Sequence, residues 1–90
     1  MQNYKFIVAG RVQGVFYRKT VYENSTKENF YGYVKNLPNG NVEACVTCEE
    51  DDVEEFIDIL KKGSKSSVVQ SIEKLPCDEV FNNGFEIRYD

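Results

Sequence analysis

Histidine and tryptophan are both absent from the 90 residues of this chain. Without histidine there is no Ser–His–Asp triad, no histidine-dependent phosphatase chemistry and no imidazole-ligated metal site. No apolar run comes near the roughly 20 residues that a membrane-spanning helix requires, and the first residues lack the apolar stretch of a secretory signal. We therefore expect a protein of the cytoplasm that has no membrane partner.

Cysteine is scarce, and its three copies are an odd number that does not build a disulfide framework. Cys45 and Cys48 fall in one expected strand, where a spacing of three residues places them on opposite faces. A zinc site would need a fourth ligand besides these two and Cys77. The sixth position after each cysteine is not arginine, which excludes a cysteine phosphatase. We expect structural thiols, no metal and no other cofactor.

The charge has no basic excess, since the net value is −4. It is unevenly distributed: residues 1–47 carry six basic and three acidic side chains (+3), and residues 48–90 carry five basic and twelve acidic ones (−7). Proteins that bind nucleic acid usually carry a broad basic face instead. A positive first half in an acidic chain favours a small anionic ligand, although ordinary surface charge remains an alternative.

The hydrophobic pattern predicts a single domain over residues 1–90, since 41% of the residues are hydrophobic and six are Phe and six Tyr. It predicts strands at 4–9, 30–37, 41–47, 68–75 and 85–89, a helix at 16–28 with a weak stripe of Tyr17, Val21 and Ser25, and a clearer helix on Val53, Phe56, Ile57 and Leu60. Asn29 suits the left-handed end of the first helix, and Gly63 the end of the second.

The order β-α-β-β-α-β with a short extra C-terminal strand predicts an α+β fold of ferredoxin-like type. In this plan an antiparallel sheet carries both helices on one face. The chain runs up the first strand, down the helix and up the second strand. The loop after 4–9 and the end of 30–37, near Lys35 and Asn36, should therefore share one edge, and Cys48 should lie at the opposite edge.

The segment Gly10–Arg18 has the character of a phosphate-holding loop. Its two glycines permit a tight backbone path, and it enters an expected helix, whose first N–H groups and dipole favour an anion. Arg18 adds a forked, permanently charged donor that matches phosphate oxygens. Taken alone, Arg18 also fits a solvated helix arginine.

Asn36 is the second candidate, because the strand order brings it to the edge of this loop. Its amide oxygen can accept a proton from a water molecule and direct that water at phosphorus, which is catalysis by positioning. The simpler alternative is a turn asparagine bonded to its own backbone. A site of one arginine, one asparagine and backbone amides has no strong acid, so it suits acyl phosphates, whose carboxylate leaving group needs no protonation.

Two motifs give a more specific interpretation. Gly10–Arg18 reads G-R-V-Q-G-V-F-Y-R and matches G-R-V-Q-G-V-x-[FY]-R, the first motif of the acylphosphatase family. Gly32–Asn36, followed by Gly40 and Val42, matches the family's second motif. Over nearly its whole length the chain resembles a small acylphosphatase.

The resemblance implies a ferredoxin-like sandwich and metal-free hydrolysis, in which an acyl phosphate and water give a carboxylate and inorganic phosphate. Inorganic phosphate is then a product and an inhibitor, and a monomer is expected. The implied catalytic residues are Arg18 and Asn36, with Asn36 orienting the water. The implied phosphate-binding segment comprises Gln13, Gly14, Val15, Phe16, Tyr17 and Arg18.

One departure and two rival interpretations remain. Cys48 stands where the family's second motif usually closes with glycine, at the edge away from the expected site. An RNA-binding domain shares the element order, and Tyr31–Val34 matches part of its signature, but on the second strand instead of the third. A domain that binds phosphate without turnover is the other alternative. The physiological acyl phosphate and the redox state of the cysteines stay open.

Overall fold

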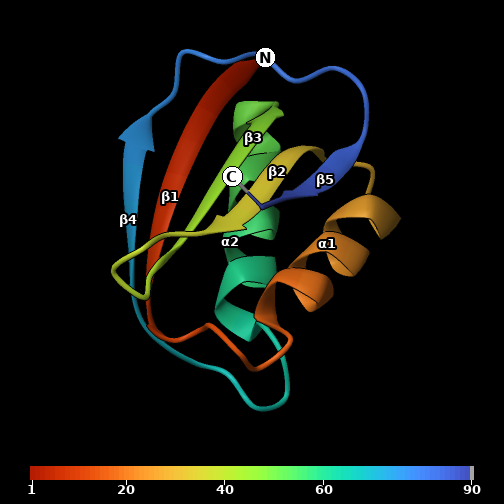
Figure 1. Ribbon diagram of the computed structural model, residues 1–90. Coiled ribbons are helices and arrows are strands. Elements are labelled where there is room, and N and C mark those ends of the chain that lie inside the picture. Colours follow the sequence, from red (N-terminus) through yellow and green to blue (C-terminus); the bar gives the residue numbers. More distant parts are fainter. Residues whose placement is uncertain (90) are drawn as a thin grey trace.

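The computed structural model describes residues 1–89 and shows a five-stranded sheet with two helices packed on one face (Figure 1). The strands are β1 (Gln2–Arg11), β2 (Tyr31–Asn36), β3 (Val42–Cys48), β4 (Val68–Pro76) and β5 (Phe85–Arg88). The helices are α1 (Tyr17–Lys27), the short 3-10 helix η1 (Glu50–Asp52) and α2 (Val53–Lys62). The α+β sandwich of ferredoxin-like type is thus confirmed, and every expected helix and strand is present.

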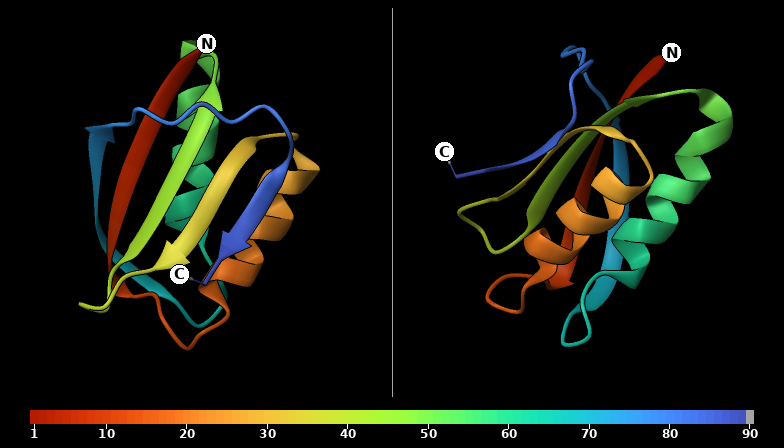
Figure 2. Two further views of the ribbon diagram at one scale, coloured as in Figure 1. Left: turned by 45° about the horizontal axis from the view of Figure 1, so that its top comes forward. Right: turned by 90° about the vertical axis from the view of Figure 1, so that its right-hand side faces the viewer.

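The sequence predicted an antiparallel sheet, and this prediction is wrong for one strand pair, because the sheet is mixed. Its strand order is β4-β1-β3-β2-β5, and β5 pairs in parallel with β2, with Lys35 opposite Arg88. The reason is the connection over residues 77–84, which crosses the sheet before β5 begins (Figure 2). As a result β2 and β5 run in the same direction and end at the same edge.

The core lies between the sheet and the helices. Phe6 and Val8 of β1 are fully buried, and Phe6 packs against Phe56 of α2 with ring centroids 5.7 Å apart. The buried residues of α1 are Tyr17, Val21 and Ser25, which confirms the weak stripe expected for this helix. Among residues 1–89, no helix is long and apolar enough to cross a membrane.

The connections end the elements where the sequence indicated. Asn29 follows α1 with φ 62°, and Gly63 ends α2 with φ 51°, the left-handed region in both cases. At the β2–β3 turn, the Gly40 N–H donates to the Leu37 carbonyl at 3.2 Å. This short turn places Asn36 directly opposite Val42, which in turn pairs with Val8 of β1.

The two cysteines of β3 lie on opposite faces of the sheet, as their spacing predicted. Cys48 belongs to the core beneath the helices. Cys45 is buried on the other face, where its thiol donates to the Tyr33 hydroxyl at 3.1 Å. Cys48 pairs with Gln2, so it lies at the edge away from Arg11 and the glycine loop.

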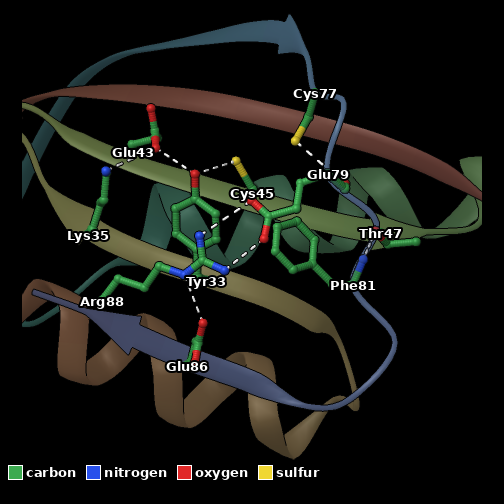
Figure 3. Close-up of polar contacts among 10 residues, drawn as sticks. All are labelled: Tyr33, Lys35, Glu43, Cys45, Thr47, Cys77, Glu79, Phe81, Glu86 and Arg88. Carbon is green, nitrogen blue, oxygen red and sulfur yellow. Dashed lines mark hydrogen bonds and ion pairs between the residues drawn. The ribbon is translucent and has the colours of Figure 1, made fainter. Parts of the chain in front are cut away.

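The face without helices carries a paired polar cluster, which we call the outer cluster: Tyr33, Glu43, Cys45 and Arg88 (Figure 3). The Tyr33 hydroxyl donates to Glu43 at 2.6 Å, and Lys5 and Lys35 lie 3.9 and 4.0 Å from the same carboxylate. The Arg88 guanidinium stacks 3.9 Å from the Tyr33 ring centroid. The outer cluster thereby fastens the end of β5 to β2.

Candidate active site

The loop between β1 and α1 has left-handed backbone at two residues, and two of its carbonyl groups accept hydrogen bonds from within the protein. Gly14 has φ 71° and Phe16 has φ 62°, and Phe16 stands immediately before α1. The Phe16 carbonyl accepts from the N–H and the hydroxyl of Thr20, at 3.1 and 2.9 Å. The Val15 carbonyl accepts from the Ser64 hydroxyl. The N–H groups of the first turn of α1 have no acceptor within the helix, so donors are what this loop offers to a ligand.

Gln13 braces the loop against the β2–β3 turn. Its side-chain amide donates to the carbonyls of Leu37 at 2.9 Å and Asn41 at 2.7 Å. Leu37 directly follows Asn36, so these two bonds hold the loop beside the strand end that carries Asn36. The sequence predicted a backbone contribution of Gln13 to phosphate binding and did not foresee this role of its side chain.

The opposite side of the loop rests on the end of α2. The Tyr17 hydroxyl donates to the Leu60 carbonyl at 2.7 Å, and burial raises the pKa of this phenol. The ring lies so close to Gly63 that a Cβ there would meet its Cε1 carbon at 2.6 Å. Gly63 is therefore needed both for its positive φ and for the space that Tyr17 fills. Both contacts fix the start of α1.

Arg18 lines a pocket of about 290 Å³ that adjoins the loop. The other lining residues are Gly14, Phe16, Tyr17, Lys19, Ile87 and Tyr89. The Arg18 guanidinium lies 5.0 Å from the Tyr89 ring centroid, a cation–π contact. Two cationic side chains and the start of a helix meet here, which is the electrostatic environment that a phosphate group prefers.

Asn36 ends β2 at the same edge, and its side-chain oxygen is unusual. The Oδ1 atom is buried and has no hydrogen-bond partner among residues 1–89. A buried amide oxygen without a partner is unfavourable, and such atoms in native proteins call for an explanation. The other side-chain atom of this kind is Ser25 Oγ, but Ser25 lies on the fully buried face of α1, whereas Asn36 is only partly buried.

The structure therefore brings most of the expected site together. Residues 13–16 lie in the loop and residues 17–18 begin α1, and the two Gln13 bonds hold this segment beside the end of β2 that carries Asn36. Asn36 does not line the Arg18 pocket itself. The sequence did not identify Ser64, which holds the loop, or Ile87 and Tyr89, which line the pocket. The final strand was predicted correctly, but Ile87 and Tyr89 could be placed at the pocket only by knowing that this strand pairs in parallel with β2.

Among residues 1–89, no three His, Cys, Asp or Glu side chains gather as a metal site requires. The expected absence of a metal stays a prediction that a chelator can test. The three cysteines are free thiols. Burial raises the pKa of Cys45 to about 12, with a smaller contribution from nearby Cys77, and burial raises that of Cys48 to about 11. Neither buried thiol suits a nucleophile near neutral pH.

Comparisons with known proteins agree with this geometry. The family model for acylphosphatase matches residues 4–87. The chain is 42% identical to an acylphosphatase of Caldivirga maquilingensis over 96% of this chain and 93% of that one, and 41% identical to one of Vibrio vulnificus over 92% of each. A crystal structure of the Bacillus subtilis acylphosphatase superposes with a TM-score of 0.89 at 34% identity, covering 99% of this chain and 100% of that one. The chain therefore belongs to the acylphosphatase family.

Proposed function

We propose that this acylphosphatase hydrolyses the carboxyl–phosphate bond without a metal ion, with Arg18 and Asn36 as its catalytic residues. The observation that carries the proposal is the Asn36 Oδ1 atom, which is buried without a hydrogen-bond partner. Gln13 of the loop bonds to the carbonyl of Leu37, the residue after Asn36, and so holds the loop beside this atom. In this proposal the loop would bind the phosphoryl group, and Asn36, from a different element, would supply the acceptor for the attacking water.

Binding of the phosphoryl group rests on residues 13–18. The carbonyls of Val15 and Phe16 are already bonded to Ser64 and Thr20, so the loop presents N–H groups instead of oxygens to the anion. The Arg18 guanidinium adds two parallel N–H donors and a full positive charge. Charge that develops on the phosphoryl oxygens in the transition state meets donors that are already in place.

Asn36 would act on the nucleophile. Its Oδ1 accepts a hydrogen bond from a water molecule and directs the water oxygen at phosphorus, in line with the bridging oxygen. The new bond joins that oxygen to phosphorus, the bond from phosphorus to the bridging oxygen breaks, and the carboxylate leaves with the electron pair. The water proton passes to phosphate or to solvent. Positioning of this kind contributes several kcal/mol to catalysis.

The leaving group explains how so sparse a site can work. A carboxylic acid has a pKa of about 4, so the departing carboxylate is stable without a proton near neutral pH. An alcohol leaving group would need a general acid, and neither proposed catalytic residue, Arg18 or Asn36, can serve as one. Acyl phosphates are therefore the substrate class that fits, with inorganic phosphate as product and competitive inhibitor.

Hydrolysis of acetyl phosphate in the presence of excess EDTA tests the proposal. We expect hydrolysis well above the spontaneous rate, undiminished by the chelator, and competitive inhibition by inorganic phosphate. A p-nitrophenyl phosphate assay is the matched control, and its turnover should be far slower. A strict metal requirement, or no hydrolysis above background, would overturn the proposal.

We further propose that residues 1–90 act as one domain and as a monomer in the cytoplasm. The three free cysteines and the acidic net charge support this setting. Sedimentation or light scattering at micromolar concentration measures the oligomeric state, and a mass near 10.4 kDa is expected.

A further inference from the structure

The connection between β4 and β5, over residues 77–84, crosses the face of the sheet that carries the outer cluster (Figure 2). Its path over β3 is set by Phe81, whose N–H donates to the Thr47 hydroxyl oxygen at 2.8 Å. The Phe81 ring also packs against Tyr33, with ring centroids 5.4 Å apart. Thr47 lies two residues after Cys45 on the same strand, so both side chains point to this face. The connection therefore passes over β3 close to Cys45.

The register of the sheet brings Cys77 to the same place. Cys45 pairs with Lys5 of β1, and Lys5 pairs on its other side with Leu75 of β4. Cys77 follows Leu75 by two residues and begins the connection. Figure 3 shows the sulfur atoms of Cys45 and Cys77 turned toward each other. Burial is the main cause of the raised pKa of Cys45, and interaction with the Cys77 thiol raises it further, as expected of two thiols in close proximity.

The two thiols differ in what can reach them. Cys45 is fully buried, and its thiol donates to the Tyr33 hydroxyl at 3.1 Å. Cys77 is half-buried, and its thiol donates to the Glu79 carbonyl at 3.7 Å, a long contact from a weak donor. A reagent in solution can reach the Cys77 sulfur but not the Cys45 sulfur. Oxidation of Cys45 in the folded protein therefore has to proceed through Cys77.

We propose that Cys45 and Cys77 form an intramolecular disulfide when the protein meets a small oxidising disulfide such as oxidised glutathione. The bond joins β3 to the start of the connection and closes a loop of about 30 residues. Cys48 takes no part, because it belongs to the core on the other face of the sheet. Free thiols are the resting state in a reducing cytoplasm, and the bond forms when the glutathione pool is oxidised.

The reaction proceeds by two thiol–disulfide exchanges. The Cys77 thiolate attacks one sulfur of oxidised glutathione, the sulfur–sulfur bond of that molecule breaks, and one glutathione thiolate leaves with the electron pair. The Cys45 thiolate then attacks the Cys77 sulfur, and the second glutathione thiolate leaves. The two protein thiols together lose two protons and two electrons, and oxidised glutathione is reduced to two glutathione molecules. Since burial raises the pKa of Cys45 to about 12, the second exchange is the slower one.

The disulfide changes both the outer cluster and the connection. Cys45 no longer donates to Tyr33, which keeps its own bond to Glu43 at 2.6 Å. The connection gains a covalent attachment two residues before Glu79, which bonds to Arg88 at 2.9 Å. A cross-link that closes a loop of this length stabilises a fold by more than one thiol hydrogen bond does. The oxidised protein should therefore be more stable than the reduced protein.

The test treats the protein with oxidised glutathione at about pH 9 and follows its mass over time. We expect a transient glutathione adduct and then a monomer that has lost two hydrogens, in which peptide mapping finds Cys45 linked to Cys77. The Tm should rise by about 5–10 °C on oxidation and return on reduction. Cys48→Ala removes the thiol on the other face of the same strand, so it is the matched control and should be oxidised like the wild-type protein.

Two further variants separate the steps. Cys77→Ala, at a half-buried position, should take up no glutathione while folded, and Cys45→Ala should stop at a glutathione adduct on Cys77. A wild-type protein that keeps the adduct, or that forms a disulfide-linked dimer or a bond to Cys48, would overturn the proposal. So would a Cys45–Cys77 bond that forms only after unfolding in urea, because the folded structure is what brings these two thiols together.

Discussion

Polar groups on strand β2 are fully paired in the outer cluster but not at the end of the strand, where Asn36 lies. In the outer cluster, the Tyr33 hydroxyl both donates to Glu43 and accepts from the Cys45 thiol. Three residues further along the same strand, the Asn36 Oδ1 is buried without a partner. Complete pairing is what a stable fold requires of buried polar groups. The difference supports our proposal that the outer cluster serves stability, whereas the edge formed by the β1–α1 loop and Asn36, here called the loop edge, serves ligand binding.

The backbone conformation of Phe16 and the surroundings of the two arginines, Arg18 and Arg88, show the same contrast. The loop edge contains Phe16 in a left-handed conformation and Arg18 on a pocket wall. In the outer cluster, Arg88 is stacked on a ring and bonded to two carboxylates, which raise its pKa. Strain and free donors concentrate where the proposed chemistry occurs, and they persist because the surrounding contacts over-determine the loop. Substitutions in the two regions should therefore have opposite effects on activity and stability.

The largest expected effect is that of Arg18→Ala. We expect kcat/KM for acetyl phosphate to fall about 10³-fold, because a charged donor to the transferred group is lost, while the free energy of unfolding changes by less than about 0.5 kcal/mol. Lys27→Ala removes the same charge from the far end of α1 and should leave kcat/KM unchanged. Steady-state kinetics and urea unfolding measure both quantities. A large loss of stability with little loss of activity would reverse the roles assigned to the two regions.

Tyr33→Phe should show the converse behaviour. It removes one hydroxyl that bonds to Glu43 at 2.6 Å and to Cys45 at 3.1 Å, so the buried Cys45 thiol and the partly buried Glu43 carboxylate each lose one partner. We expect a loss of about 1–3 kcal/mol in the free energy of unfolding and less than a twofold change in kcat. Tyr31→Phe, on the same strand but outside the cluster, is the control for stability. A Tyr33→Phe protein as stable as wild type would show that the pairing in the outer cluster contributes nothing.

The pH dependence of stability should show a smaller effect, to which Cys45 of the outer cluster and Cys48 of the core both contribute. Burial raises the pKa of Cys45 to about 12 and that of Cys48 to about 11, from an ordinary 9.0, so the folded protein favours the neutral thiols. Their contribution to stability is complete below about pH 9 and is lost as the pH rises through the folded-state values. Urea unfolding at pH 8 and pH 10.5 should show this decline. Cys45→Ala should make it shallower, and an unchanged slope in that variant would contradict the assignment.

The sequence was sufficient to predict that Asn36 lies beside the β1–α1 loop, because the local signals and the strand order agree there. Two glycines and an arginine mark the loop, and the order of elements places Asn36 beside it. The antiparallel hairpin of β2 and β3 is set by the turn at Leu37–Gly40. Even the weak helix stripe was readable, because Tyr17, Val21 and Ser25 keep helical spacing although serine is polar.

The remaining features depend on contacts that no local pattern encodes. The stacking of Arg88 on Tyr33 follows from the parallel pairing of β5 with β2, and the sequence predicted an antiparallel sheet. Likewise, the Ser64 hydroxyl reaches the Val15 carbonyl across 49 positions of the chain. Register and side-chain direction decide such contacts, and single-sequence patterns fix neither.

The most direct test of the account is Asn36→Ala, measured for activity, phosphate binding and stability in the same preparation. We expect kcat for acetyl phosphate to fall about 100-fold, the inhibition constant of inorganic phosphate to stay within about threefold, and the free energy of unfolding to hold or rise, since a buried unpaired oxygen is removed. That combination would show that the oxygen is kept for the water and not for the fold. Full activity in this variant, or a loss of stability with kcat retained, would contradict the central claim.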